Sequence, residues 1–153
     1  MRSFRYSIKA IIIKEGKLLT IIKKIDDSIF RILPGGGHEF GETIGQTVVR
    51  ECEEETGLQV KVHDLLFVRD YIGKNHEFAD KDKDMQQTEL FFRCEVISDL
   101  NFGESMHPDT NQIGVEWIDI NRLDETKLYP SALKKLIPGI GKEKLDIYLG
   151  DCN

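Results

Sequence analysis

The residues best suited to chemistry lie in a short glutamate-rich segment, ECEEET at residues 51–56. Glu51, Glu54 and Glu55 are spaced i, i+3 and i+4, which places them within an arc of roughly 100° on one helix face. Like charges this close destabilise a helix, so the cluster indicates a positive counter-charge that the sequence itself does not fully supply. Carboxylate oxygens are the ligands that hard divalent cations prefer. The spacing therefore predicts a metal site on this helix.

A glycine-rich segment precedes the glutamates. Glycine allows positive φ and close approach of the backbone, so the segment could lie against a phosphate or could simply turn sharply into the helix. The residues that we interpret as substrate-binding are three glycines and the two cations nearest to them, namely Gly35, Gly36, Gly37, Arg31 and Lys23, with Lys24 as a further cation. The lysines have an alternative interpretation, because lysines also solvate the edge strands of sheets.

The segment from Gly36 to Leu58 resembles the Nudix box, whose pattern is G-x5-E-x7-R-E-U-x-E-E-x-G-U with U a bulky apolar residue. Every fixed position matches. Cys52 stands where Ile, Leu or Val is usual, but a buried thiol packs as a small hydrophobe, so we do not interpret it as a loss of function. The resemblance implies an α/β fold, an α/β/α sandwich around a mixed β-sheet in which the box forms a loop, a helix and a loop. It also implies hydrolysis of a nucleoside diphosphate linked to another group.

Hydrolysis of a phosphoanhydride bond needs an attacking water and a stabilised phosphate leaving group, and metal ions serve both needs. The resemblance implies Mg²⁺ or Mn²⁺ as the cofactor, with Glu51, Glu54 and Glu55 as its ligands and Glu51 alternatively as the base. Arg50 could orient a neighbouring carboxylate through a bidentate pair. Glu42 could hold the loop to the helix.

Nudix enzymes often take a further acidic ligand or base from outside the box. Our order of preference in this chain is Glu89, then Glu95, then a residue of the polar segment 72–86 such as Glu77. The four histidines are scattered without metal-ligand spacing, so we expect surface or structural roles for them.

One helix must position the carboxylates, and we expect it to span Thr43 to Thr56, with Gly57 as its C′ residue. An apolar stripe that includes Val48 and Cys52 runs beside the carboxylate arc. The helix can therefore bury one side in the core and present the carboxylates at the edge of that core.

Runs rich in β-branched residues predict the strands around this helix. The predicted strands are a hairpin of 5–14 and 17–25, then 30–33, 60–71 with a bend near 63–64, 88–97, 114–120, and an edge strand in the tail. Polar loops are predicted at 72–86 and 98–112, and a short helix at 131–137 with Ser131 as its N-cap.

The chain has 153 residues, 40% of them hydrophobic and 31% charged, which is typical of one soluble globular domain spanning 1–153. The longest apolar run near the start, residues 10–13, is too short for a signal peptide or a membrane span, so we expect a cytoplasmic protein with no membrane partner. Three cysteines without C-x-x-C spacing argue against disulfides and zinc. We expect them to fill the core, or, for Cys152, to be exposed.

The net charge of −6 is unevenly distributed, because residues 1–35 hold eight Lys and Arg against three Asp and Glu. The remaining chain is strongly acidic, which argues against a surface that coats long nucleic acid and favours a small nucleotide as the substrate. A homodimer is left open as a further expectation.

Two other functions stay open at this point. The chain could be a catalytically inactive nucleotide-sensing or binding module that keeps the Nudix fold, although the complete glutamate set argues against it. An isomerase with a similar fold is less favoured. Among hydrolase substrates, the sequence does not distinguish nucleotide sugars, ADP-ribose, nucleoside triphosphates, dinucleoside polyphosphates and capped RNA. We expect specificity to lie in the two polar loops and a base to stack on Phe30, Tyr71 or Phe78.

Overall fold

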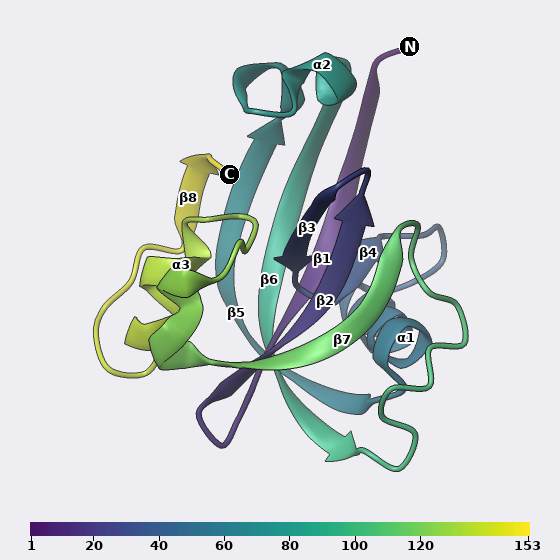
Figure 1. The fold of residues 1–153 in the computed structure, drawn as a ribbon, viewed down its shortest axis with the longest axis vertical. Coiled ribbons are helices and arrows are strands. Elements are labelled where there is room, and N and C mark those ends of the chain that lie inside the picture. The colour runs from purple at the N-terminus through teal and green to yellow at the C-terminus, as the bar shows by residue number, and fades with distance from the viewer.

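A computed structural model describes residues 1–153 and contains one eight-stranded mixed sheet (Figure 1). The strand order is β3-β2-β1-β6-β5-β8, with β4 paired to β1 and β7 paired to β2. β1 is parallel to β6 and β5 is parallel to β8, whereas the other pairs are antiparallel. The strands are β1 (Ser3–Lys14), β2 (Lys17–Ile25), β3 (Ser28–Ile32), β4 (Gly35–Gly37), β5 (Gln59–Ile72), β6 (Met85–Ser98), β7 (Gln112–Asp119) and β8 (Tyr148–Asp151).

Helix α1 (Ile44–Thr56) carries the glutamate cluster and lies against one face of the sheet. It begins with a capping box, in which Thr43 Oγ1 accepts a hydrogen bond from the Gln46 N–H and Gln46 Oε1 accepts one from the Thr43 N–H. It ends at Gly57, whose φ of 74° is left-handed. The predicted helix is therefore confirmed, with a start one residue later.

Two hydrophobic clusters lie on opposite faces of the sheet. On one face, Val48 and Cys52 of α1 pack against Ile8 of β1. On the other face, Leu123 of the 3-10 helix η2 (Ile120–Glu125) packs with Leu133 of α3 (Leu133–Leu136). The 3-10 helix η3 (Ile137–Gly139) continues that layer. Helices on both faces of a mixed sheet form the predicted α/β/α sandwich, which is confirmed.

The glycine segment, predicted as a loop, forms strand β4 instead. It pairs antiparallel with β1, so that Gly36 lies opposite Ile8. An ideal Cβ on Gly35 would lie 2.0 Å from the Ile8 carbonyl oxygen, and the φ of Gly35 is 139°. Only glycine allows the backbones of β4 and β1 to approach this closely. The glycines thus bring the start of the box directly against the central strand.

The predicted polar loop at 72–86 is partly folded, which corrects our expectation. It contains the 3-10 helix η1 (Gly73–Asn75) and the one-turn helix α2 (Ala79–Asp82). Tyr71 Oη donates a hydrogen bond to Asp82 Oδ2 at 2.8 Å, which ties α2 to the end of β5. The segment lies over the end of the sheet where β5 ends, as Figure 1 shows.

The bend predicted in the long strand is confirmed, since β5 shifts register between Val62 and Leu65. The predicted edge strand in the tail is also confirmed as β8, which pairs with β5. The N-cap prediction for Ser131 is wrong, because Ser131 Oγ donates to the Asn153 carbonyl oxygen at 2.6 Å and the helix starts only at Leu133. Cys152, expected to be exposed, is half-buried.

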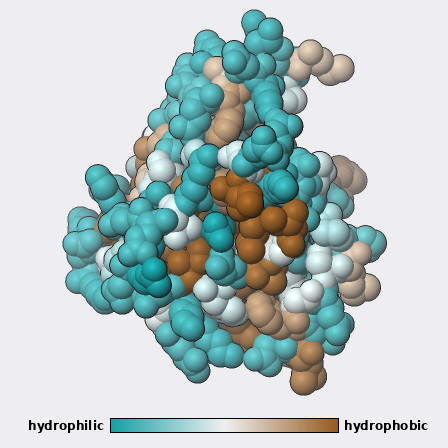
Figure 2. Space-filling model, viewed as in Figure 1, coloured by the Kyte–Doolittle hydropathy of each residue, from teal (hydrophilic) through white to brown (hydrophobic).

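The surface is mostly hydrophilic on the face shown in Figure 2, with apolar side chains gathered in the middle, over β2, β3 and β7. Exposed isoleucines on these strands include Ile29 and Ile113. No helix in the structure combines the length and the hydropathy that crossing a bilayer requires.

Candidate active site

Arg50 forms ion pairs with four carboxylates and donates hydrogen bonds to three of them. Its Nε donates to Glu42 Oε1 at 2.6 Å, and its Nη1 donates to Glu51 Oε1 at 3.0 Å and to Glu54 Oε2 at 3.3 Å. The hydrogen bond from Arg50 lowers the pKa of Glu42 to about 2. Arg50 therefore supplies part of the counter-charge that the glutamate cluster requires, and Glu42 anchors Arg50 from the loop side.

Glu55 is on the same helix but has a different environment. It is only 3% exposed, and its Oε2 accepts a hydrogen bond from the Gly35 N–H at 3.2 Å. Burial raises the pKa of Glu55 to about 8, against the opposing effects of the nearby Lys9 charge and the Gly35 hydrogen bond. Arg50 makes no hydrogen bond to Glu55, so the demand for positive charge is least satisfied at this carboxylate.

The three predicted metal ligands share one helix face, but no three acidic, histidine or cysteine side chains converge as they stand. Glu51 and Glu54 turn toward Arg50, and Glu55 turns toward β4. The donor set consists of carboxylate oxygens, one of them buried without a cationic hydrogen-bond partner. That chemistry fits a hard divalent cation, which binds oxygen ligands and favours ionised carboxylates.

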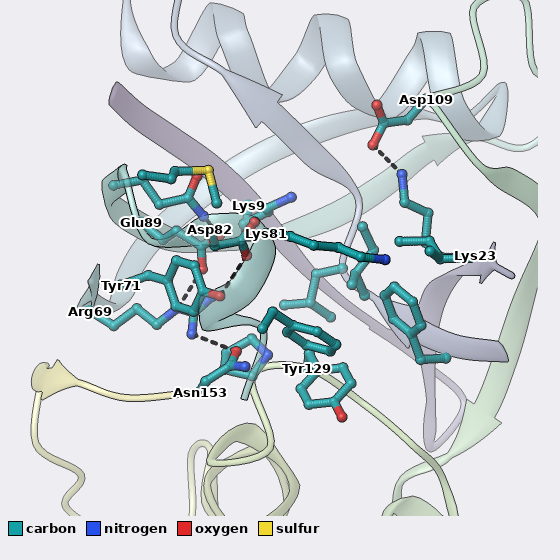
Figure 3. A pocket seen from close by; sticks show the side chains of 18 of the residues that line it. Lys9, Lys23, Arg69, Tyr71, Lys81, Asp82, Glu89, Asp109, Tyr129 and Asn153 are labelled. Carbon is teal, nitrogen blue, oxygen red and sulfur yellow. Dashed lines mark hydrogen bonds and ion pairs between the residues drawn. The ribbon is translucent and has the colours of Figure 1, made fainter. Parts of the chain in front are cut away.

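A cavity of about 520 Å³ opens on the face of the sheet opposite α1, within the range of small-molecule sites. Phe30 of β3, Phe78 and Tyr129 form an aromatic cluster in its wall, with ring centroids 5.4 to 6.4 Å apart, and Tyr129 packs edge-to-face with both phenylalanines. Figure 3 shows Tyr129 on one side of the cavity and Lys9, Arg69 and Glu89 on the other.

An ion pair forms the floor of this cavity. Arg69 of β5 donates from Nε to Glu89 Oε2 at 2.6 Å, and Gln87 Nε2 donates to Glu89 Oε1 at 2.8 Å. Glu89 is 4% exposed and Arg69 is 5% exposed. Both oxygens of Glu89 already accept hydrogen bonds, so the carboxylate is held in place by its neighbours, as Figure 3 shows for Arg69.

Comparison with known proteins identifies the family. The family model of the NUDIX domain matches residues 4–139. The chain belongs to the NUDIX domain family. The match extends well beyond the Nudix box and covers β1 to η3, so the family prediction is confirmed for most of the chain.

Relatives and solved structures of Nudix proteins agree with this assignment. An ADP-ribose pyrophosphatase of Methanocaldococcus jannaschii is 33% identical over 120 residues, which cover 76% of this chain and 63% of that relative. A NUDIX hydrolase from Nitrosomonas europaea superposes with a TM-score of 0.71 at 20% identity, covering 90% of this chain and 88% of that one. An ADP-ribose pyrophosphatase from Streptococcus suis gives 0.66 at 20% identity, covering 96% and 98%. These structures share the Nudix fold.

Within the Nudix box, the structure brings the glycines and glutamates together. An ideal Cβ on Gly36 would lie 2.5 Å from Glu51 Oε1, so the missing side chain makes room for this carboxylate. Gly37 accepts a hydrogen bond from Arg50 Nη2 at its carbonyl oxygen. The roles that we predicted for these residues stay predictions, but their proximity is now established.

The predicted cations have different positions. Lys23 lines the cavity, where its Nζ lies 2.6 Å from Asp109 Oδ2 and also donates to the Thr110 carbonyl oxygen. Arg31 lies outside the cavity and pairs with Glu116 at 2.7 Å. Lys24 is exposed outside it. The structure therefore does not bring Arg31 to the Nudix box, although the sequence separation suggested it.

The second and third choices for an acidic group outside the box lie apart from it. Glu95 is exposed and pairs with His63 at 2.8 Å. Glu77 accepts a hydrogen bond from Asn153 Nδ2 at 3.1 Å. Neither contacts the box glutamates or lines the cavity, whereas Glu89 does line it.

Several cavity residues escaped the sequence analysis, among them Lys9 and Asp109. Lys9 lies beside Glu55, with its Nζ 3.3 Å from the Gly35 carbonyl oxygen. Asp109 is exposed, and although desolvation opposes it, the hydrogen bond and charge of Lys23 lower its pKa. Lys9 had a usable signal, since it is one charge inside a β-branched strand and alternation places it opposite Ile8. Asp109 had none, because a loop gives no periodicity.

Proposed function

We propose that the chain is a metal-dependent pyrophosphohydrolase that cleaves the phosphoanhydride bond of a small nucleoside diphosphate linked to another group. One observation carries this proposal. The acidic face of α1 and the aromatic, cation-lined cavity meet at the glycine strand β4, where Glu55 and Lys9 both contact Gly35. A substrate with a diphosphate between two organic groups needs both halves of this site. The metal-binding face would neutralise the diphosphate, and the cavity would hold a base or sugar.

Glu51, Glu54 and Glu55 would hold Mg²⁺ or Mn²⁺ in this proposal. When bound, the ion would neutralise phosphate charge and polarise the attacking water. Arg50 keeps Glu51 and Glu54 on one side of the helix through its hydrogen bonds, and Glu42 holds Arg50. Glu89 holds the guanidinium of Arg69 in the cavity, so we propose that it positions Arg69 and does not accept a proton.

The substrate class that we propose is of the ADP-ribose or nucleotide-sugar type. The relative from Methanocaldococcus jannaschii is an ADP-ribose pyrophosphatase, and this chain corresponds to 63% of its length. The cluster of Phe30, Phe78 and Tyr129 offers aromatic edges and faces for a base. Long RNA is disfavoured, because its many phosphates require an extended cationic surface and the chain carries a net charge of −6.

Product analysis on a substrate panel tests the proposal. The purified protein with Mg²⁺ would be given ADP-ribose, UDP-glucose, ATP and 5′-triphosphorylated RNA. Water attack on one phosphorus of ADP-ribose yields AMP and ribose 5-phosphate, which chromatography identifies. We expect the two small diphosphates to be cleaved fastest, with a weak dependence on salt at saturating Mg²⁺.

Glu54→Gln provides the inactive variant and Glu53→Gln its matched control. Both remove one charge from α1 without changing side-chain volume, but Glu53 is exposed on the opposite side of the helix. We expect Glu54→Gln to lose turnover by orders of magnitude and Glu53→Gln to keep it. Binding of ADP-ribose without turnover by the unaltered chain would instead support the sensing module. A preference for RNA with a steep salt dependence would refute the proposed substrate class.

A further inference from the structure

The cations that line the cavity differ in whether they are neutralised. Three of them form ion pairs with carboxylates, at 2.6, 2.6 and 3.7 Å: Lys23 with Asp109, Arg69 with Glu89, and Lys81 with Asp26. Arg5 and Lys9, both on β1, form none. Arg5 Nε donates to the neutral Gln87 Oε1 at 2.9 Å, and Lys9 Nζ donates to the Gly35 carbonyl oxygen. These two positive charges are therefore available to an anion.

The register of β1 and β4 places both cations beside the glycine strand. Ser7 lies opposite Gly37 and Lys9 lies opposite Gly35, so these residues share the cavity face of the sheet. Arg5 shares it as well, two positions before Ser7. An ideal Cβ on Gly37 would have one neighbour within 4 Å, Arg5 Nη1 at 4.0 Å. Gly37 thus leaves space beside Arg5, while Gly35 packs directly against the backbone of Lys9, and Arg5 and Lys9 themselves line the cavity.

Ser7 adds an independent observation. It is 0% exposed, and its Oγ is the one buried side-chain nitrogen or oxygen in the chain that lacks a hydrogen-bond partner. An unpartnered buried hydroxyl costs free energy, so it calls for a partner from outside the chain, such as a water or an ion. It lies on β1 between the two unneutralised cations. Residues 5–9 of β1 therefore hold two cations without an ion-pair partner and one hydroxyl without a hydrogen-bond partner.

We propose that Arg5 and Lys9 form an anion subsite that holds the diphosphate of the substrate on the cavity face of β4. The inference rests on the proposed function and assigns the charge recognition that the box cannot provide. The α1 face is acidic and repels phosphate, whereas Arg5 keeps both terminal nitrogens free to donate and Lys9 adds a point charge. On an extended strand the two Cα atoms are about 13 Å apart, a span that two long side chains can close around a diphosphate.

A preference for two phosphates over one follows from the two cations. The diphosphate substrate engages both charges, whereas a monophosphate product engages one. AMP should accordingly bind more weakly than ADP-ribose even when no metal is present, which favours product release.

Calorimetric titration in EDTA tests the subsite separately from catalysis. The probes would be ADP-ribose, inorganic pyrophosphate and adenosine, and the variants Arg5→Gln, Lys9→Gln and Lys9→Arg. Lys17→Gln is the control, because Lys17 is exposed on β2 outside the cavity and its loss changes the net charge equally. Each Gln variant at Arg5 or Lys9 should weaken binding of ADP-ribose and pyrophosphate roughly tenfold or more, as expected for a charge-assisted hydrogen bond. Adenosine affinity should not change, and Lys9→Arg should restore most of the loss.

Three results would overturn the subsite: wild-type affinity for pyrophosphate in both Gln variants, an equal loss of adenosine binding, or no binding of any probe by the unaltered chain. The proposed function fails in a different way. If the chain binds ADP-ribose through Arg5 and Lys9 but does not hydrolyse it with Mg²⁺, the subsite stands and the hydrolase assignment falls. If it hydrolyses ADP-ribose and the variants bind as the wild type does, only the subsite falls.

Discussion

Replacing Gly36 by alanine should separate catalysis from folding, because the new methyl group would meet the end of a flexible side chain. An ideal Cβ there would lie 2.5 Å from Glu51 Oε1 and 2.6 Å from its Cδ, so the carboxylate must move. Its charged hydrogen bond from Arg50 would be lost at a cost of about 1.5–3 kcal/mol. Loss of a glycine restricts the unfolded chain and offsets this by about 0.4–1 kcal/mol. We expect a loss of stability of about 0.5–2.6 kcal/mol and turnover lower by orders of magnitude.

Gly35→Ala is the matched comparison, and we expect it to destabilise the fold itself. Here the Cβ would lie 2.0 Å from the Ile8 carbonyl oxygen, and φ is 139°. Backbone strain of about 1–3 kcal/mol and overpacking of a similar size should destabilise the domain by several kcal/mol. Urea unfolding followed by circular dichroism measures stability, and ADP-ribose hydrolysis measures turnover. Full activity in folded Gly36→Ala would refute the placement of Glu51, and wild-type stability in Gly35→Ala would refute the close approach of β4 to β1.

Three further substitutions test the helix that carries the site. Val48→Ala should destabilise the domain by about 1–3 kcal/mol because Val48 is fully buried under α1; an unchanged urea midpoint would mean that the helix is rotated. Gly45→Ala should stabilise it by about 0.5–1 kcal/mol, since the nearest atom to its Cβ would be Thr43 Oγ1 at 4.0 Å; a loss of stability would show an unseen steric conflict. In EDTA, stability should fall as pH rises from 4.5 to about 8, because folding raises the pKa of Glu55 and the unfolded chain then binds fewer protons. Glu55→Gln should remove most of this slope, and an equal slope in that variant would contradict the assignment to Glu55.

The helix and its carboxylate arc could be predicted because their signals are local. The helix is capped by Thr43 and Gln46 at its start and by Gly57 at its end, and its apolar stripe repeats with the helical period. Each of these signals involves residues only a few positions apart. The Nudix box adds fixed spacing. The glycine strand was missed for the opposite reason. Three glycines read as a loop in isolation, and their pairing with β1 depends on a partner 28 positions away, the separation between Ile8 and Gly36.

The cavity was the part that sequence could not assemble. Its floor joins Arg69 and Glu89 across β5 and β6, and its wall joins Phe30 with Tyr129, which are 99 positions apart. Such contacts depend on strand order and register, which a linear pattern leaves undetermined. Arg31 illustrates this limit of sequence analysis. Its position close to the glycines in sequence suggested that it binds substrate, but in the structure its side chain pairs with Glu116 outside the cavity.

Positive charge is distributed unevenly over the glutamate cluster. Arg50 contacts most of its carboxylates, whereas Glu55 lies next to Lys9 of the cavity. Arg50 satisfies Glu42, Glu51 and Glu54, which explains why like charges are tolerated on one turn of α1. Glu55 receives only a backbone N–H and the field of Lys9, which do not offset its burial, so the pKa of Glu55 is raised to about 8. A divalent cation entering the box would have to displace that proton, and a diphosphate bound at Lys9 would remove positive charge from beside Glu55. Under the proposed function, a metal ion and a diphosphate would both change the charge around Glu55, and the two halves of the site would meet at β4, where Glu55 and Lys9 both contact Gly35.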